Sequence, residues 1–213
     1  MKLAKGSASW ILTSLVLGLL FLVLSIFFER LELKSVLIFI SLVCFLLVIF
    51  FMMFFRDPER KIGKHIVACA DGKIREITEL KDDDIGKCIC ISTFMNVHNV
   101  HVNRMSIDGK IISIKHYSGL HIPAFKKESE KNERVVIIAD TNIGKIKIVQ
   151  IAGTLARRIV PYVKKDDELK KGDKIGIIRL GSRVDVYLPV KKINVKVGDI
   201  VRAGVDTIAE IDD

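Results

Sequence analysis

The residues of this chain whose types and spacing could do the most unusual chemistry are Gly181 and Ser182. They lie near the C-terminus, between two apolar, strand-like runs, 177–180 and 184–188. A glycine carbonyl has no flanking side chain to shield it, and the next serine hydroxyl is placed to attack it. The dipeptide therefore predicts either an ordinary turn or a serine that cleaves its own backbone.

A serine hydroxyl is a poor nucleophile without a base, so the histidines and carboxylates come next. His101 lies between two valines, and strand alternation places its side chain on the face opposite to theirs. It is either a hydrogen-bonded core histidine or a base. Asp71 precedes Gly72 and is either a hairpin turn residue or the acid that orients a histidine.

Four further segments accompany Gly181-Ser182 in order along the chain. They are Phe54-Phe55-Arg56-Asp57-Pro58-Glu59-Arg60, Ala70-Asp71-Gly72-Lys73-Ile74, Ile91-Ser92-Thr93-Phe94-Met95 leading into Val100-His101-Val102-Asn103-Arg104, and Gln150-Ile151-Ala152-Gly153 with Ala156-Arg157-Arg158. With these motifs the chain, from about residue 54 to its end, resembles the phosphatidylserine decarboxylase proenzyme family in its short prokaryotic and archaeal (archaetidylserine decarboxylase-like) form. That family is pyruvoyl-dependent. The resemblance implies a carboxy-lyase that converts a serine phospholipid, phosphatidylserine or archaetidylserine, into the ethanolamine phospholipid.

Removing CO₂ from an α-amino acid leaves a carbanion beside nitrogen, and an imine to a carbonyl cofactor supplies the electron sink that it needs. The chain lacks the large α/β core of a pyridoxal phosphate enzyme, so the resemblance implies a carbonyl made from Ser182 itself. The hydroxyl attacks the Gly181 carbonyl to give an ester, and elimination then releases the upstream chain as a carboxylate. Hydrolysis with loss of ammonia leaves a covalent pyruvoyl group. The implied products are a β chain, 1–181, and an α chain, 182–213, paired as a heterodimer or within a larger oligomer.

The resemblance also assigns roles to single residues. His101 matches the motif histidine and Asp71 is its implied acidic partner. Longer members have a second histidine three residues after the first; counted from His101 that position holds Arg104, so His116 is a reserve base. The candidate cations for the substrate phosphate, which arginine binds with paired N–H groups, are Arg157, Arg158 and Arg183. No metal is implied.

These residues need a scaffold, and its first part is a hairpin of two apolar runs, 6–28 and 35–55. Each has about 21 to 23 residues without a charge, which is enough to cross a bilayer as a helix. The first run is longer than the apolar core of a cleaved signal peptide and has no Ala-x-Ala-like exit. Lys2, Lys5 and Arg56 flank the two ends that emerge together, so the positive-inside rule predicts a cell-membrane protein whose C-terminal domain is cytoplasmic.

The second part, 56–213, is predicted to be an all-β domain, because short β-branched runs alternate with turn residues. The expected strands are 88–93, 110–115, 134–139, 145–151, 174–180, 184–188, 191–195 and 207–211, and only 154–163 has a weak helical period. Lys171-Gly172-Asp173 and Val197-Gly198-Asp199 repeat one turn signal before a strand, as in barrel-sandwich folds of the lipoyl carrier kind. The predicted fold class is therefore a transmembrane helical hairpin followed by a β barrel-sandwich-type decarboxylase domain.

Composition narrows the class of partner. The net charge is +9, which favours attraction to anionic lipid, whereas scattered cations and few aromatic residues outside the hairpin disfavour nucleic acid. Cys69, Cys88 and Cys90 are expected to be reduced core residues; a zinc site with His98 and His101 is the alternative, but Cys-x-Cys is not the usual spacing. A non-catalytic, lipoyl-like adaptor domain is the second functional hypothesis, and it predicts an uncut chain.

Overall fold

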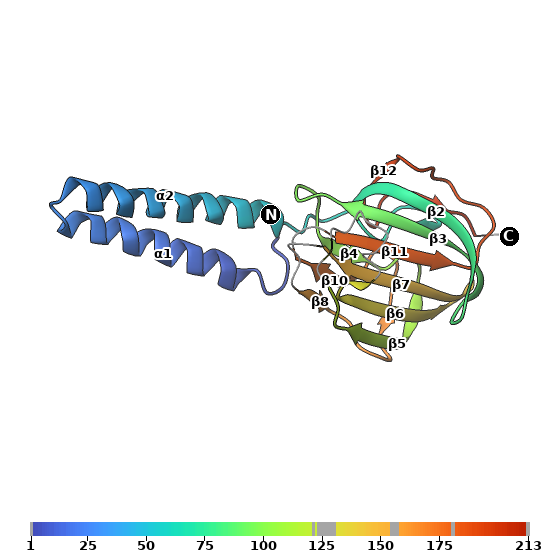
Figure 1. The fold of residues 1–213 in the computed structure, drawn as a ribbon. Helices are drawn as coiled ribbons and strands as arrows, with labels where there is room; N and C mark the ends of the chain where they lie inside the picture. Colours follow the sequence, from blue (N-terminus) through green and yellow to red (C-terminus); the bar gives the residue numbers. More distant parts are fainter. Residues whose placement is uncertain (1, 121, 123–130, 154–157, 180–181, 212–213) are drawn as a thin grey trace. The chain divides into compact units, whose positions relative to one another are not determined.

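A computed structural model describes residues 2–120, 122, 131–153, 158–179 and 182–211. The chain divides into two compact units, Met1–Glu59 and Arg60–Asp213. Figure 1 shows a helical hairpin in the first unit and a β domain in the second. Gly181 and Arg157, two residues of the expected site, lie outside the described residues.

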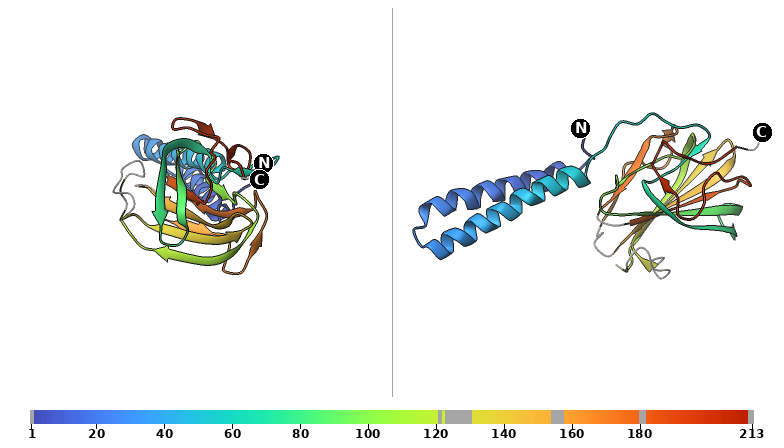
Figure 2. Two further views of the ribbon diagram at one scale, coloured as in Figure 1. Left: turned by 90° about the vertical axis from the view of Figure 1, so that its right-hand side faces the viewer. Right: turned by 90° about the horizontal axis from the view of Figure 1, so that it is seen from above.

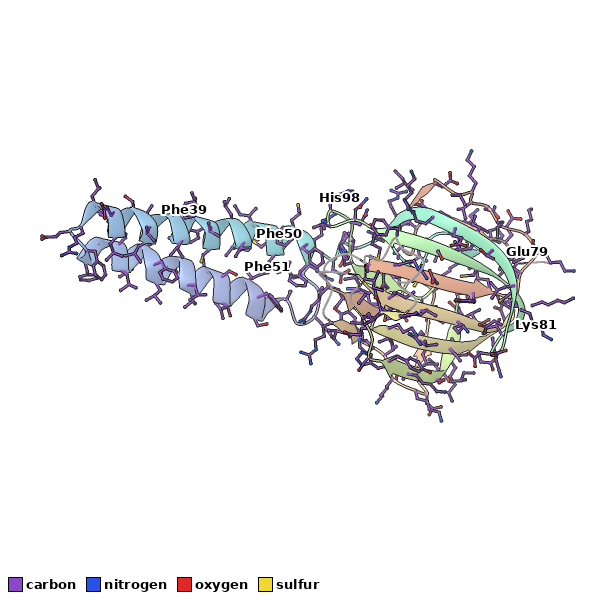
Figure 3. The ribbon with its side chains drawn as sticks, viewed as in Figure 1. Phe39, Phe50, Phe51, Glu79, Lys81 and His98 are labelled. Carbon is purple, nitrogen blue, oxygen red and sulfur yellow. The ribbon has the colours of Figure 1, made fainter. Side chains whose placement is uncertain are left out.

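The first unit consists of α1 (Ala8–Phe27) and α2 (Leu31–Phe54), which confirms the predicted apolar hairpin. Both helices are long and apolar enough to cross a membrane. They approach closely at Gly18, where an added Cβ would lie 3.3 Å from Cys44 Cβ, and the Ser41 hydroxyl donates to the Gly18 carbonyl at 2.8 Å. Phe39, on α2, is largely exposed, as a lipid-facing side chain would be (Figure 3).

The second unit is built from strands in three sheets, which confirms the all-β prediction. The strands are β1 (Ile66–Val67), β2 (Gly72–Asp82), β3 (Gly86–Met95), β4 (Val102–Arg104), β5 (Gly109–Tyr117), β6 (Arg134–Thr141), β7 (Gly144–Ala152), β8 (Ile159–Pro161), β9 (Glu168–Leu169), β10 (Lys174–Ile178), β11 (Ser182–Leu188), β12 (Ile200–Val201) and β13 (Thr207–Ala209). The largest sheet has the order β12-β2-β3-β11-β7-β6-β5-β9. The smaller sheets have the orders β4-β10-β8 and β1-β13.

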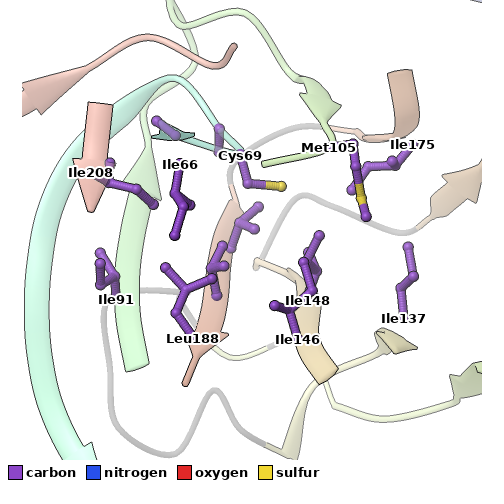
Figure 4. Close-up of a cluster of buried hydrophobic side chains, with 14 of the residues drawn as sticks. Ile66, Cys69, Ile91, Met105, Ile137, Ile146, Ile148, Ile175, Leu188 and Ile208 are labelled. Atoms are coloured by element: carbon purple, nitrogen blue, oxygen red, sulfur yellow. The ribbon is translucent and has the colours of Figure 1, made fainter. Parts of the chain in front are cut away.

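The large sheet is strongly curved, as two further views show (Figure 2). Its inward-facing isoleucines and leucines pack against side chains from the two small sheets and form one core (Figure 4). Figure 4 labels Ile91, Ile137, Ile146, Ile148 and Leu188 from the large sheet, and Ile66, Cys69, Met105, Ile175 and Ile208 from the segments opposite. Each large aliphatic side chain buried in this way stabilises the fold by about 1.5–3 kcal/mol.

The two Gly-Asp turns have the same geometry, as their repeated sequence suggests. Gly172 and Gly198 both have positive φ, 89° and 105°, which favours glycine. The carboxylates of Asp173 and Asp199 each accept a hydrogen bond from the backbone three residues earlier, at 2.8 and 3.0 Å. Each turn leads directly into a short strand, β10 and β12 respectively.

Parts of the strand prediction are wrong. The run 191–195 is not a strand, since only Ile193 forms an isolated bridge, to Ala209. The weak helical period over 154–163 fails where the structure describes it, because Ile159–Pro161 is β8. β2 was not expected, because its eleven residues are mostly charged or half-exposed and it depends on pairing with β3.

Candidate active site

Strand termini meet at the end of the large sheet where β11 begins, which we call the site end. Ser182 is the first residue of β11 and lies directly opposite Met95, the last residue of β3, and Ala152, the last residue of β7. Figure 3 shows His98, in the turn after β3, at this end, and Glu79 and Lys81 of β2 at the other. Pairing therefore places Ser182 between two neighbouring strand ends.

The Ser182 side chain is fully buried, and its hydroxyl lies 3.2 Å from the Met95 sulfur. A thioether is a weak acceptor, so this contact leaves the hydroxyl oxygen little stabilised by its surroundings. The site is shielded from water because Met95 and Ala152, on both sides of Ser182, have no exposed surface. A serine hydroxyl that is excluded from water and contacts only a weak acceptor is consistent with a nucleophile. A serine in an ordinary surface turn would be solvated.

The buried side chains of Asn103 and Gln150 form a hydrogen-bonded pair next to Met95. The side-chain amide nitrogen of Asn103, Nδ2, is 3.6 Å from the Met95 sulfur. The side-chain Nε2 of Gln150 donates to Asn103 Oδ1 at 2.7 Å. Gln150 Oε1 is buried and makes no hydrogen bond to the described residues. Gly176 leaves room for this side chain, because a Cβ there would lie 2.9 Å from Gln150 Nε2. The sequence motif around Gln150 thus contributes a polar wall to the serine site.

His101 is fully buried, just before β4. Its Nδ1 lies 2.9 Å from the backbone carbonyl of Asn99, and a carbonyl can only accept, so Nδ1 donates this hydrogen bond. The His101 carbonyl accepts from the Ile178 N–H at 3.4 Å, at the end of β10. His101 therefore lies beside the strand that leads toward Ser182, four residues further on.

Asp71 follows a segment that runs antiparallel to Arg104–Ser106. The Val67 N–H donates to the Ser106 carbonyl at 3.0 Å, and the Arg104 N–H donates to the Cys69 carbonyl at 2.8 Å. The Asp71 carboxylate accepts two N–H bonds from Arg60, at 2.5 and 2.8 Å, and a third from the Ala203 backbone at 2.8 Å. Burial of both side chains makes this a well-formed, largely desolvated ion pair.

The other side of Ser182 is organised by Asn132 and Glu133. The Asn132 amide donates to the Ala152 carbonyl at 2.7 Å, and the Ala152 N–H donates to the Glu133 carbonyl at 2.9 Å. The Glu133 carboxylate lies 3.0 Å from His116 Nε2 and accepts from the Ile159 N–H at 3.3 Å. These contacts tie β5, β6, β7 and β8 together at the site end.

His116 does not lie on a strand next to Ser182. It lies on β5, three strands from β11, and neighbouring strands are about 4.8 Å apart, so the separation along the sheet is about 14 Å. Its side chain is also half exposed. His116, the second candidate base, therefore lies at the site end but not next to Ser182.

The candidate phosphate ligands differ in their surroundings. Arg183 alternates to the opposite face of β11 from Ser182 and donates to Asp185 at 2.8 and 3.1 Å, which neutralises it. Arg158 is exposed, directly before β8. Of the two adjacent arginines in the motif, only Arg158 is among the described residues.

The cysteines are buried, as expected for core residues. Burial raises the pKa of the Cys69 thiol to about 12, although a backbone hydrogen bond from Arg104 lowers it slightly. Burial likewise raises the pKa of Cys90 to about 12. Within the described part of the chain no three His, Cys, Asp or Glu side chains gather into a group that could hold a metal.

Comparison with known proteins gives the family. The model of the phosphatidylserine decarboxylase family matches residues 47–209. This chain belongs to the phosphatidylserine decarboxylase family. It is 44% identical over 212 residues to a protein of Methanococcoides burtonii named as an archaetidylserine decarboxylase proenzyme, covering 98% of this chain and 96% of the relative. It is 41% identical over 209 residues to a phosphatidylserine decarboxylase proenzyme of Streptomyces avermitilis, covering 97% and 93%.

The position three residues after His101, where the resemblance to longer relatives leads one to expect a second histidine, holds Arg104. Arg104 is instead a buried structural residue whose guanidinium donates to the Gly172 carbonyl at 2.9 Å. Asn132 and Glu133 were not predicted as site residues, because their contacts with Ala152 depend on how the strands pair.

Proposed function

We propose that the chain is a membrane-anchored proenzyme that cleaves itself between Gly181 and Ser182. The mature protein then converts a serine phospholipid into the ethanolamine phospholipid and CO₂. The observation that carries the proposal is Ser182 itself: a fully buried serine at a strand start, in a chain of the decarboxylase family, with its hydroxyl against a sulfur.

His101 is the proposed base. Its Nδ1–H is held by the Asn99 carbonyl, so Nε2 is the nitrogen that can take the Ser182 proton. Asp71 is the proposed acidic partner, and its charge stabilises the imidazolium that forms. Hydrogen bonds from Arg60 and from the Ala203 N–H hold the Asp71 carboxylate in place. His116, paired with Glu133, is proposed to orient the strand ends rather than to move the proton.

The surroundings of Ser182 fit a pyruvoyl group derived from it. A ketone in place of the hydroxyl would remain dry between Met95 and Ala152, with the amides of Asn103 and Gln150 behind Met95. The pyruvoyl carbonyl supplies the electron sink for decarboxylation. The residues of this chain exclude water and return a proton to the product, the latter being the proposed task of His101 during turnover.

The mature enzyme is proposed to be a heterodimer of its own β chain, 1–181, and α chain, 182–213. β11 pairs with β3 on one side and with β7 on the other over nearly its whole length. Val184, Val186 and Leu188 of this strand are buried in the core. The α chain therefore stays attached after cleavage, and the two chains should co-elute without denaturant and separate in its presence.

The hairpin is proposed to span the cell membrane with the β domain in the cytoplasm. Lys2, Lys5 and Arg56 lie at the ends of the hairpin that emerge together, against Arg30 and Lys34 at its tip. The lipid is proposed to be phosphatidylserine or archaetidylserine, because relatives of both names match almost the full chain. Their head groups are the same, so the site serves either. The adaptor hypothesis is not favoured, because the chain belongs to an enzyme family.

Mass analysis of the purified protein tests the proposal. The wild type should appear as two chains divided before residue 182, the smaller one without a free N-terminal amine. Ser182→Ala should remain one chain and release no CO₂ from a serine phospholipid. A wild-type chain that stays uncut would contradict the proposal. If a strain that lacks the gene does not accumulate serine phospholipid, the proposed substrate is wrong.

A further inference from the structure

Two exposed apolar side chains flank Ser182, one on each side of β11. Val97 lies in the turn that follows β3, two residues after Met95, which is a direct partner of Ser182. Its side chain is exposed. Hydrogen bonds between Asn96 and Asn99, at 2.8 and 2.9 Å, close this turn, so Val97 is presented by a fixed backbone and not by a frayed strand end.

Leu120 holds the corresponding position on the β7 side. It forms an isolated bridge with Asn132, and two backbone hydrogen bonds, at 2.8 and 3.3 Å, join it to the residues before and after Asn132. Asn132 in turn donates to the carbonyl of Ala152, the other direct partner of Ser182. The Leu120 residue is nevertheless 54% exposed. Both apolar side chains are therefore held beside the strand ends that enclose Ser182.

The opposite end of the large sheet presents polar and charged side chains in its turns. The turn between β2 and β3 carries Asp83 and Asp84, and the turn between β6 and β7 carries Asn142, all of them exposed. Apolar residues scattered singly over a surface need no explanation, whereas apolar residues gathered at one place mark a contact surface. The site end has this property, and the turns at the opposite end do not.

The charges at the site end indicate a lipid surface as the contact. Lys115, near the end of β5, and Arg158, directly before β8, are both exposed. Lysine and arginine side chains near a bilayer are attracted to anionic lipids, and apolar side chains beside them enter the boundary between head groups and acyl chains. A bilayer would also hold the proposed phospholipid substrate next to Ser182, which a soluble partner protein would not do.

We propose that Val97 and Leu120 dock the site end of the β domain directly on an anionic lipid surface. This rests on the function proposed above and deepens it, because it states how the substrate reaches Ser182. The head group enters between the two side chains while its acyl chains stay in the bilayer. The β domain thus meets the lipid with its own surface and does not depend on the hairpin alone.

Fluorescence quenching in an uncut chain tests this contact apart from catalysis. Full-length Ser182→Ala is reconstituted in vesicles of phosphatidylglycerol and phosphatidylcholine, and its single tryptophan is removed by Trp10→Phe. Val97→Trp or Leu120→Trp then supplies the only indole, and Asn142→Trp, at the opposite end of the sheet, is the control. We expect lipids with brominated acyl chains to quench the tryptophan at positions 97 and 120 and to leave that at position 142 unquenched. Acrylamide in the water should show the reverse order.

Equal quenching by brominated lipid at all three positions, or none at positions 97 and 120, would overturn the proposal. Protection of positions 97 and 120 from acrylamide without quenching by brominated lipid would also overturn it, because a protein surface would then cover them. If the wild-type chain never splits but both positions are quenched, the proposed function is wrong and the lipid contact stands.

Turnover gives a second measurement. The double variant Val97→Asp/Leu120→Asp should split as the wild type does. Its kcat/KM for serine phospholipid in vesicles should fall by about tenfold or more, because a carboxylate enters lipid unfavourably. A short-chain serine phospholipid dissolved in water should be converted at the wild-type rate. Val197→Asp, which changes an exposed valine in the turn before β12, is the matched control and should behave as the wild type with both substrates.

An equal loss with both substrates would mean that the double variant damages the site itself, and it would overturn the proposal. A loss of the same size in Val197→Asp would do so too, because any exposed valine would then serve. If the double variant does not split, the quenching measurement decides, since it uses an uncut chain.

Discussion

At the scale of single residues, the site depends on groups that hold other groups in place. The Asp71 carboxylate accepts hydrogen bonds from Arg60 and from the Ala203 N–H. A carboxylate has about four acceptor positions, so one that holds Arg60 still has capacity for a histidine. In the proposed mechanism Asp71 therefore has two separable tasks, one in stability and one in chemistry.

Paired substitutions should separate these two tasks. Arg60→Met leaves the buried Asp71 carboxylate without its cation, which costs about 3–5 kcal/mol and lowers the melting temperature by on the order of 10 °C. The double variant Arg60→Met/Asp71→Leu removes both charges and should regain most of that stability. It should nevertheless remain uncut, because His101 then lacks its acid. Thermal unfolding and a denaturing gel measure the two effects; a double variant that splits normally would show that Asp71 is structural only.

Asn132 is the second residue with a defined positioning task. Its amide joins the Ile122 backbone to the carbonyl of Ala152, which is the direct partner of Ser182. Asn132→Ala should cost about 1–3 kcal/mol, because a buried carbonyl is left unpaired, and should slow splitting of the chain. The exposed Asn142→Ala is the control. A time course of splitting on a gel checks this, and equal rates for the two variants would contradict it.

The proposed reacting residues could be chosen from short motifs, but the residues that contact and position them could not. Gly181-Ser182 and His101 stand out because a few adjacent residue types suffice to identify them. The link from Asn132 to Ala152 spans 20 residues and depends on the register of β6 against β7. Arg60 lies 11 residues before Asp71, and nothing in its local sequence indicates burial in an ion pair. Such partners require the folded sheet.

At the scale of elements, strand pairing rather than strand propensity places the site. β11 was expected to begin at Val184, but it begins at Ser182 because Met95 and Ala152 pair with that residue on both sides. β2 shows the opposite failure. Most of its residues are polar and lie outside the core. The sequence alone therefore does not indicate a strand, and its pairing with β3 is what defines it.

The far end of β2 is attached to β7 by an ion pair between Asp82 and Lys147, both nearly buried. Burial raises the pKa of Asp82, but hydrogen bonds from Lys147 and from the Asp84 and Ile85 backbone, with the charge of Lys147, outweigh it, so the net direction is down. A carboxylate with a lowered pKa stabilises the fold above its unfolded pKa, about 3.9, and this contribution is lost as the pH falls through the folded value.

Asp82→Asn should therefore destabilise the domain at pH 7 by about 1–3 kcal/mol, and the difference from wild type should shrink below pH 4. Thermal unfolding of detergent-solubilised protein at a series of pH values measures it. Asp83→Asn changes an exposed neighbour and serves as the control. A difference that grows in acid would mean that Asp82 is destabilised rather than stabilised in the folded state.

At the scale of the whole molecule, the chain consists of two compact units, an apolar helical hairpin and a β domain that holds the proposed site. The β domain has its own core of buried aliphatic side chains drawn from its three sheets. The hairpin is apolar around its circumference, with exposed leucines, isoleucines and phenylalanines that suit lipid better than water. The residues proposed for self-cleavage all belong to the second unit, whereas a phospholipid substrate is part of a membrane.

Removal of residues 1–59 should therefore have unequal effects on the two reactions. The remaining chain, from Arg60 onward, keeps the Arg60–Asp71 ion pair and the whole core, so it should split before Ser182 as completely as the full chain. Its turnover of serine phospholipid in vesicles should fall by about tenfold or more, because an anchored enzyme holds a high effective concentration at the surface. Presenting the substrate in detergent micelles should restore most of the rate. Gel analysis and CO₂ release measure both; a truncated chain that remains whole would mean that the hairpin takes part in maturation.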